Sequence, residues 1–164
     1  MKIYNDKEKE KIEKKRLSNE RLTEFFKEKR TDWNDKVKDI FSKITHKNIN
    51  KENYRKIIDS QGAALTYSQI LNDEISFFLN KLSTIKSKIK ELKQEKFIFY
   101  STGFQLKTKI GEKKLLIDGN LAEWEKESDL IESHIDFLRD TKGDLRSFNF
   151  SIKNIIQLID FIGE

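Results

Sequence analysis

The apolar residues between positions 71 and 99 recur at alternating steps of four and three, the spacing of a helix that packs against another helix. Such a helix is apolar along one whole face, and that face needs a partner to be removed from water. We therefore predict a long helix over residues 54–100, with Gly62 as a candidate break. The residues on this face, called the apolar seam, are Leu71, Ile75, Phe78, Leu82, Ile85, Ile89, Leu92, Lys96 and Phe99.

The composition excludes several classes of protein. The 164 residues include no proline, which leaves long helices uninterrupted, and no cysteine, which excludes disulfides and thiolate metal sites. No apolar run approaches the ~20 residues that span a bilayer. The first residues also lack the apolar core of a signal peptide. We therefore expect a cytoplasmic protein without a membrane partner.

Charge is distributed unevenly along the chain. Residues 1–55 contain 17 Lys/Arg and 11 Asp/Glu, residues 56–117 contain 11 and 6, and residues 118–164 contain 5 and 11. The basic middle segment can attract phosphate groups, whereas the acidic last segment can pair with the middle segment or repel nucleic acid. Lysines and aromatic residues also cluster at the end of the long helix. This pattern favours a protein that binds polyanions over an enzyme.

Residues 1–55 are predicted to form a charged N-terminal helical extension, and residues 56–164 a helical DNA-binding and oligomerisation domain. Within the extension, the pattern predicts an amphipathic helix over residues 19–45. The charge-dense stretch before it would alone be a solvated or frayed helix. A polar linker or turn is expected over residues 46–53. The extension fits a partner-docking arm and a structural brace equally well.

A further helix is predicted over residues 121–145, and it carries acidic residues beside its apolar positions. The long helix before it has lysines at the corresponding flanks. Because complementary flanks select helix partners, we predict that helix 67–99 pairs antiparallel with helix 121–145. Its heptad positions are Trp124, Ser128, Ile131, Ile135, Leu138 and Leu145, and the acidic flanks are Glu125, Glu127 and Glu132.

Between these two helices the sequence changes to strand-like alternation. Residues 104–110 are predicted as a short strand, and residues 114–117 as the returning strand of a basic β-hairpin or loop. Asp118-Gly119-Asn120 is a turn and helix-start signal. The expected fold is mainly α, with long antiparallel helices, coiled-coil-like packing, this short hairpin and a C-terminal oligomerisation helix.

The last segment is apolar around most of its circumference, more than one neighbouring helix would bury. We therefore expect an oligomer interface, with the core of the same chain as the alternative. The candidate interface residues are Phe150, Ile152, Ile155, Ile159 and Phe161.

No residue pattern typical of catalysis is present. A Gly-rich phosphate loop ending in Gly-Lys-Ser/Thr is missing, and the two histidines, His46 and His134, are isolated. We place His134 on a helix flank. The carboxylates lie among lysines on helical faces, where solvated ion pairs explain them. We therefore expect no enzymatic activity, no metal and no cofactor.

Three short motifs follow one another in the second half of the chain. They are Lys96-Phe97-Ile98-Phe99-Tyr100-Ser101, then Leu116-Ile117-Asp118, then Phe150-Ser151-Ile152-Lys153-Asn154 followed by Phe161 and Gly163, with Arg146 upstream. In order and spacing they resemble the UvsY-type recombination mediators of T-even and related tailed phages, over about residues 67–163.

The resemblance implies a non-enzymatic accessory factor of phage recombination and repair in the cytoplasm of an infected bacterium. Such proteins bind single-stranded DNA, assemble into rings and help a recombinase displace the single-strand-binding protein. Lys96 matches a basic residue linked to DNA binding in that family. Gln94 stands where the family can have a second basic residue, and Lys93 is its candidate substitute.

The candidate contacts to single-stranded DNA are lysines, which neutralise phosphates, and one aromatic residue, which stacks on bases. They are Lys86, Lys90, Lys93, Lys96, Tyr100, Lys107, Lys109 and Lys113. The same lysines can instead be solvated or pair with the acidic helix. Tyr100 can be a core residue, as we expect for Phe99 on the apolar seam. The competing function is a structural coiled-coil scaffold that does not bind nucleic acid.

Overall fold

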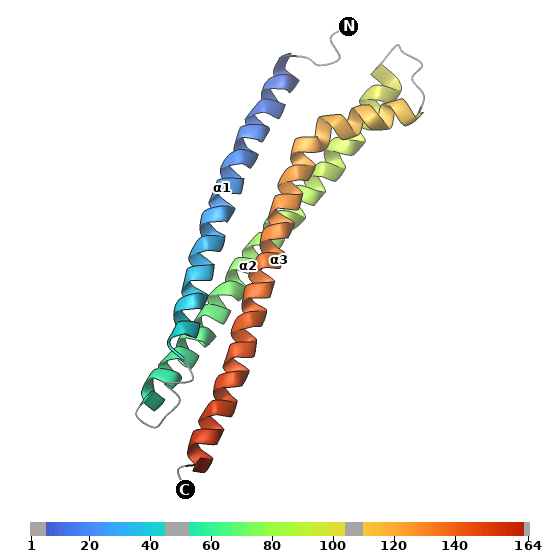
Figure 1. The fold of residues 1–164 in the computed structure, drawn as a ribbon. Coiled ribbons are helices and arrows are strands. Elements are labelled where there is room, and N and C mark those ends of the chain that lie inside the picture. Colours follow the sequence, from blue (N-terminus) through green and yellow to red (C-terminus); the bar gives the residue numbers. More distant parts are fainter. Residues whose placement is uncertain (1–5, 45–52, 104–109, 163–164) are drawn as a thin grey trace. The chain divides into compact units, whose positions relative to one another are not determined.

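The computed structural model describes residues 6–44, 53–103 and 110–162, and no residue in these ranges lies in a strand (Figure 1). Helix α1 spans Asp6–Ser42, α2 spans Tyr54–Ile98, and α3 spans Ile110–Ile162. A short π-helix, η3, covers Phe99–Gly103 directly after α2. The prediction of a mainly α protein built from long packed helices is confirmed.

The chain forms two compact units. Unit 1 comprises residues 1–26 and 78–133, and unit 2 comprises residues 27–77 and 134–164. Within the described residues, each unit contains one segment of α1, one of α2 and one of α3. The expected division into residues 1–55 and 56–164 stays a prediction.

In unit 1, α2 runs antiparallel to α3, as predicted from their charged flanks. Lys93 Nζ lies 2.7 Å from Glu125 Oε1, and further back along α2, Lys86 pairs with Glu132, further along α3. All four side chains are between 41% and 54% exposed, so each pair contributes only ~0.2–1 kcal/mol. The ion pairs therefore select the partner, and the buried apolar seam supplies most of the stability.

In unit 2, the α1 segment is anchored on α2 by Trp33, which is 1% exposed. Its indole Nε1 donates a 3.0 Å hydrogen bond to Glu74 Oε2, and its ring meets Tyr67 edge-on at 5.8 Å. Because a buried indole N–H needs an acceptor, this hydrogen bond fixes the position at which the indole can be buried. Ring stacking between Phe41 and Phe148, with centroids 4.6 Å apart, joins α1 to α3 in the same unit.

The π-helix exchanges the roles of two neighbouring aromatic residues. Phe99, expected on the apolar seam, is 53% exposed, whereas Tyr100 is 3% exposed and packs with Ile117 and Leu121 of α3. A π-helix bonds i to i+5 and holds an extra residue in its turn, so the inward-facing position moves by one residue. The expectation of a buried Phe99 is therefore wrong.

The predicted β-hairpin is not supported. Residues 114–117, the expected returning strand, belong to α3, and so does Ile110. Residues 104–109 lie outside the described ranges. Asn120 Nδ2 donates a 2.8 Å hydrogen bond to the hydroxyl of Tyr100, and the flanking residues Ile117 and Leu121 are buried. These buried contacts favour the helix over the local turn tendency of Asp118-Gly119-Asn120, so α3 begins earlier than expected.

The helices also continue through other expected boundaries. Helix α1 begins at Asp6 rather than at residue 19, α2 passes through Gly62 without a break, and α3 continues from the predicted third helix into the last segment. Exposed pairs one turn apart, such as Lys14 with Glu10 at 2.7 Å, give local support to the charge-dense start of α1.

The C-terminal apolar residues divide between core and surface. Ile152 and Ile159 are buried with Ile57 of α2 in unit 2, and Ile155 packs partly against them. The oligomer role expected for Ile152 and Ile159 is therefore corrected, because both side chains are buried within the chain itself. Phe150 and Phe161 are 68% and 81% exposed and remain candidates for an interface.

Gly62 and Gly119, two glycines at expected helix boundaries, give a direct test of the helix course. A methyl group added at either glycine meets no atom within 4 Å beyond its own helical turn. Because glycine costs ~0.5–1 kcal/mol relative to alanine inside a helix, Gly62→Ala and Gly119→Ala should each raise the free energy of unfolding by that amount. Urea denaturation followed by circular dichroism measures the change. A decrease for either variant would contradict a continuous helix at that position.

Candidate functional site

Three of the sequence-predicted lysines are engaged in ion pairs within unit 1. Lys86 pairs with Glu132 and Lys93 with Glu125, both on α3, and Lys96 pairs with Glu8 on α1. The hydrogen bond from Lys93 to Glu125 raises the pKa of Lys93, so its positive charge is firmly held at neutral pH. These lysines are cations whose charge is already partly balanced by the neighbouring helices.

The other predicted contacts are in different environments. Lys90 is exposed, and it has no ion pair among the described residues; Lys113 is half-buried near the start of α3. Tyr100 is buried and accepts a hydrogen bond from Asn120, so its ring is not presented to an unpaired base. Lys107 and Lys109 lie outside the described ranges.

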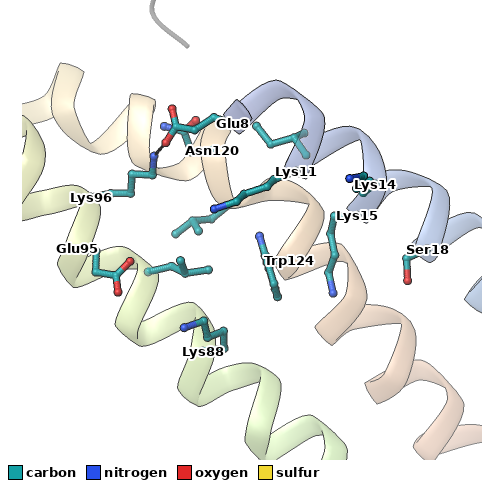
Figure 2. Close-up of a pocket in the computed structure, with 13 residues that line it drawn as sticks. Glu8, Lys11, Lys14, Lys15, Ser18, Lys88, Glu95, Lys96, Asn120 and Trp124 are labelled. Atoms are coloured by element: carbon teal, nitrogen blue, oxygen red, sulfur yellow. Dashed lines mark hydrogen bonds and ion pairs between the residues drawn. The ribbon is translucent and has the colours of Figure 1, made fainter. Parts of the chain in front are cut away.

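A hollow in unit 1 lies where the segments of α1, α2 and α3 meet, and Figure 2 shows its lining. We call it the lysine cavity; its volume is about 680 Å³. Five lysines and two glutamates surround an apolar floor. The lysines are Lys11, Lys14, Lys15, Lys88 and Lys96, the glutamates are Glu8 and Glu95, and the floor contains Ile12, Leu92, Leu121 and Trp124.

Two of the lysines that line this cavity form ion pairs that are partly buried. Lys15 and Glu127 form a pair in which the side chains are only 14% and 10% exposed, and the Lys15 ammonium lies 4.1 Å from the centre of the Trp124 ring. This cation–π contact covers one face of the indole. Removing either member of such a pair leaves a buried charge without compensation, so Lys15 and Glu127 are structural. Lys96 and Glu8 form the second pair.

The outer lysines of the cavity are held more loosely. Lys14 pairs with Glu10 and Lys88 with Glu91, at 2.7 and 3.0 Å, and all four side chains are at least 46% exposed. Lys11 is exposed and has no ion pair within the described part of the chain. Pairs this exposed contribute little, so an incoming anion can replace the carboxylate partner.

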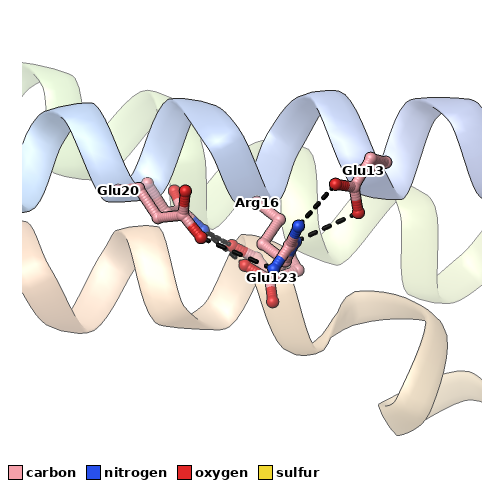
Figure 3. A network of polar contacts seen from close by, with 5 residues as sticks. Glu13, Arg16, Glu20 and Glu123 are labelled. Carbon is pink, nitrogen blue, oxygen red and sulfur yellow. Dashed lines mark hydrogen bonds and ion pairs between the residues drawn. The ribbon is translucent and has the colours of Figure 1, made fainter.

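Next to the cavity, α1 is fixed on α3 by a buried amide. Asn19 is fully buried, and its Nδ2 donates to the Glu123 carbonyl at 2.7 Å and to Glu123 Oε2 at 2.9 Å. Arg16 binds Glu13 through two hydrogen bonds of 3.0 and 2.6 Å and lies 3.6 Å from Glu20 (Figure 3). The hydrogen bonds from Arg16 lower the pKa of Glu13 and keep it ionised. The Asn19 hydrogen bonds to Glu123 fix the rotation of α1 against α3, and with it the face of α1 that carries Lys11 and Lys15.

Sequence reasoning did not find this cavity. Lys11, Lys15 and Ser18 follow one another at steps of four and three and so share one face of a helix. That spacing indicates a shared helix face, but these residues belong to the charge-dense stretch before residue 19, which the sequence predicts to be solvated. The partner residues Lys88 and Trp124 come from distant parts of the sequence, and only tertiary packing brings them to the same place.

His134 is fully buried in unit 2, not placed on a helix flank as expected. Its ring stacks on Phe137 with centroids 6.2 Å apart. Burial, together with the nearby positive charges of Arg30 and Lys29, lowers its pKa from 6.5 to about 4. It is therefore neutral in the folded protein at neutral pH. Among the described residues, no group of three or more acidic or histidine side chains is arranged to hold a metal ion.

Comparison with protein-family models, with curated proteins and with solved structures found no match for this chain. Across the described residues, no helix combines the length and apolar character needed to cross a lipid bilayer.

Burial of neutral His134 predicts a pH-dependent stability. The unfolded chain binds a proton near pH 6.5 and the folded chain only near pH 4, so the stabilisation is complete above pH 6.5 and is lost as the pH falls toward 4. The full loss amounts to about 3 kcal/mol. Urea denaturation at pH 7.5, 5.5 and 4.5 measures it. In His134→Leu the decline should be smaller. An equal decline in the variant and the unmodified protein would contradict the assignment.

Proposed function

We propose that the protein is a single-stranded DNA-binding recombination mediator, which helps to load a phage recombinase onto DNA covered by single-strand-binding protein. The order and spacing of the three motifs over residues 67–163 carry the proposal. The density of lysines in the α2 segment of unit 1 supports it, because phosphate binding requires such cations. The proposed partners are single-stranded DNA, the recombinase, the single-strand-binding protein and further copies of the chain in a ring.

The ion pairs of unit 1 define how such binding would occur. Lys86 and Lys93 are about half exposed, and each is held by a single carboxylate. A DNA phosphate can replace that carboxylate at a cost of ~0.2–1 kcal/mol per pair, while release of condensed counterions favours the exchange. Binding by each subunit would therefore be weak and salt-sensitive. A ring would strengthen it by presenting many such sites to one strand.

A helical scaffold without nucleic-acid binding is the second candidate. It is favoured by one observation, namely that Lys86, Lys93 and Lys96 already have carboxylate partners within unit 1. Under this alternative the lysines select helix partners and have no further role. The exposed Phe150 and Phe161 would serve assembly under either function.

Fluorescence anisotropy of a labelled oligo(dT) strand separates these functions. For a mediator, affinity should fall as salt rises, with a log–log slope of about −2 for three phosphate contacts per subunit, and a duplex should compete poorly. Lys90→Gln should reduce the slope, and it breaks no ion pair among the described residues. Lys38→Gln, an exposed lysine in unit 2, is the matched control. Absence of binding at low salt would exclude the mediator function and favour the scaffold.

The pair between Glu8 and Lys96 gives a second prediction. Glu8 holds the one lysine that the resemblance assigns to DNA, so Glu8→Gln should release that cation and strengthen binding to single-stranded DNA several-fold. The same anisotropy titration at a fixed salt concentration measures it. Glu28→Gln makes the same change in net charge at an exposed position of α1 in unit 2. Equal strengthening by both variants would show an effect of net charge and contradict a local role for Glu8.

A further inference from the structure

The lysine cavity contains two hydrogen-bond donors without acceptors in the described part of the chain. They are the ammonium group of Lys11 and the indole N–H of Trp124. In Figure 2 the indole nitrogen of Trp124 points to the side of the cavity where the Lys11 ammonium lies. Two unpartnered donors in one cavity, one of them charged, are suited to an anionic oxygen.

The remainder of the cavity indicates which anion fits. Its floor contains Ile12, Leu92 and Leu121, which inorganic phosphate would leave uncovered. Its volume of about 680 Å³ lies within the range of small-molecule pockets, which combine apolar walls with a few polar groups. A ligand that carries both a phosphate and a flat apolar ring satisfies the donors and the floor together.

We propose that the lysine cavity binds one nucleotide unit, either free or within a single strand. Lys11 and the indole N–H of Trp124 hold the phosphate, and the outer Lys14 adds a second cation once it leaves Glu10. The base lies on the apolar floor, and the indole face that Lys15 covers is not available for stacking. Glu95, across the cavity on α2, keeps the phosphate on the α1 side by repulsion.

The single-strand form of this inference rests on the proposed function, whereas the free-nucleotide form does not. The phosphate donors of this site belong to α1 and α3, whereas the lysines predicted from the sequence as DNA contacts belong mostly to α2; one of those, Lys96, also lines the cavity. In the single-strand form, α1 would be part of the DNA-binding surface, so residues 6–26 would be more than a brace.

Trp124 itself supplies the signal for the test. The chain has two tryptophans, and in Trp33→Phe all indole fluorescence comes from Trp124. Titration with dTMP, with oligo(dT) and with inorganic phosphate should show saturable changes for the first two probes and a much weaker one for phosphate. Because Trp33 is buried, its substitution could disturb the fold. Calorimetric titration of the unmodified protein with dTMP therefore repeats the binding measurement without that substitution.

Lysine variants then locate the site. Lys11→Gln should weaken dTMP binding about tenfold, the effect of losing one charge-assisted hydrogen bond. Lys126→Gln removes an exposed lysine of α3 outside the cavity and should leave binding unchanged. Equal loss in both variants, or no response of Trp124 to either nucleotide probe, would overturn the inference. An equal response to inorganic phosphate would also overturn it, because the apolar floor would then contribute nothing.

The two nucleotide probes separate this inference from the proposed function. A response of Trp124 to dTMP without binding of oligo(dT) would support the cavity and contradict the mediator. A response to oligo(dT) alone would support the cavity and identify the strand as its source. Strong binding of oligo(dT) measured by anisotropy, with no fluorescence response of Trp124, would overturn the cavity site but remain consistent with the mediator function.

Discussion

Burial of the apolar seam of α2 is the interaction on which the other features depend. Leu71 is fully buried in unit 2, and Phe78, Leu82, Ile85 and Ile89 are at most 9% exposed in unit 1. Each such side chain contributes ~1.5–3 kcal/mol when it is removed from water, several times the value of an exposed ion pair. The long polar faces of α1 and α3 can therefore be charged, because the seam supplies the stability that those faces lack. The lysines beside the seam are consequently free to differ in role, some selecting a partner helix and others facing solvent.

Much of the fold could be predicted because heptad spacing and flank charge are local properties of the sequence. They correctly predicted a long helix ending near residue 100 and its antiparallel pairing with α3 in unit 1, where Lys86 and Lys93 meet two of the acidic flank residues. The errors occur where a contact with a distant residue overrides a local preference. Asp118-Gly119-Asn120 has turn chemistry, but Asn120 is held by Tyr100, twenty residues earlier in the sequence. The π-helical turn moves the buried position from Phe99 to Tyr100. The helical periodicity of the sequence does not predict the extra residue in that turn.

The candidate site was less predictable than the fold for the same physical reason. Lysines in a sequence can be counted, but whether each is paired depends on which carboxylates the packing brings near it. Lys96 illustrates this, because its partner Glu8 belongs to a stretch of the sequence that appeared unrelated to the motif containing Lys96. The lysine cavity is a stronger case, since its lining comes from three helix segments that no local pattern connects. The charge distribution predicts a polyanionic ligand, whereas tertiary contacts determine which cations are available to any anion.

The paired lysines also constrain how a polyanion could be bound and released. A carboxylate beside each lysine acts as a counterion built into the protein, so neutralising a phosphate requires displacement of Glu132, Glu125 or Glu8. This exchange lowers the affinity for any single phosphate. When the ligand departs, each lysine regains its carboxylate partner, so no charge is left without compensation. A factor that must place a strand and then yield it to another protein benefits from such weak, replaceable contacts. A permanent scaffold also uses the pairs, but it has no need for Lys11 and the indole N–H of Trp124 to face the cavity without an acceptor of their own among the described residues. This difference makes the cavity the more informative part of unit 1.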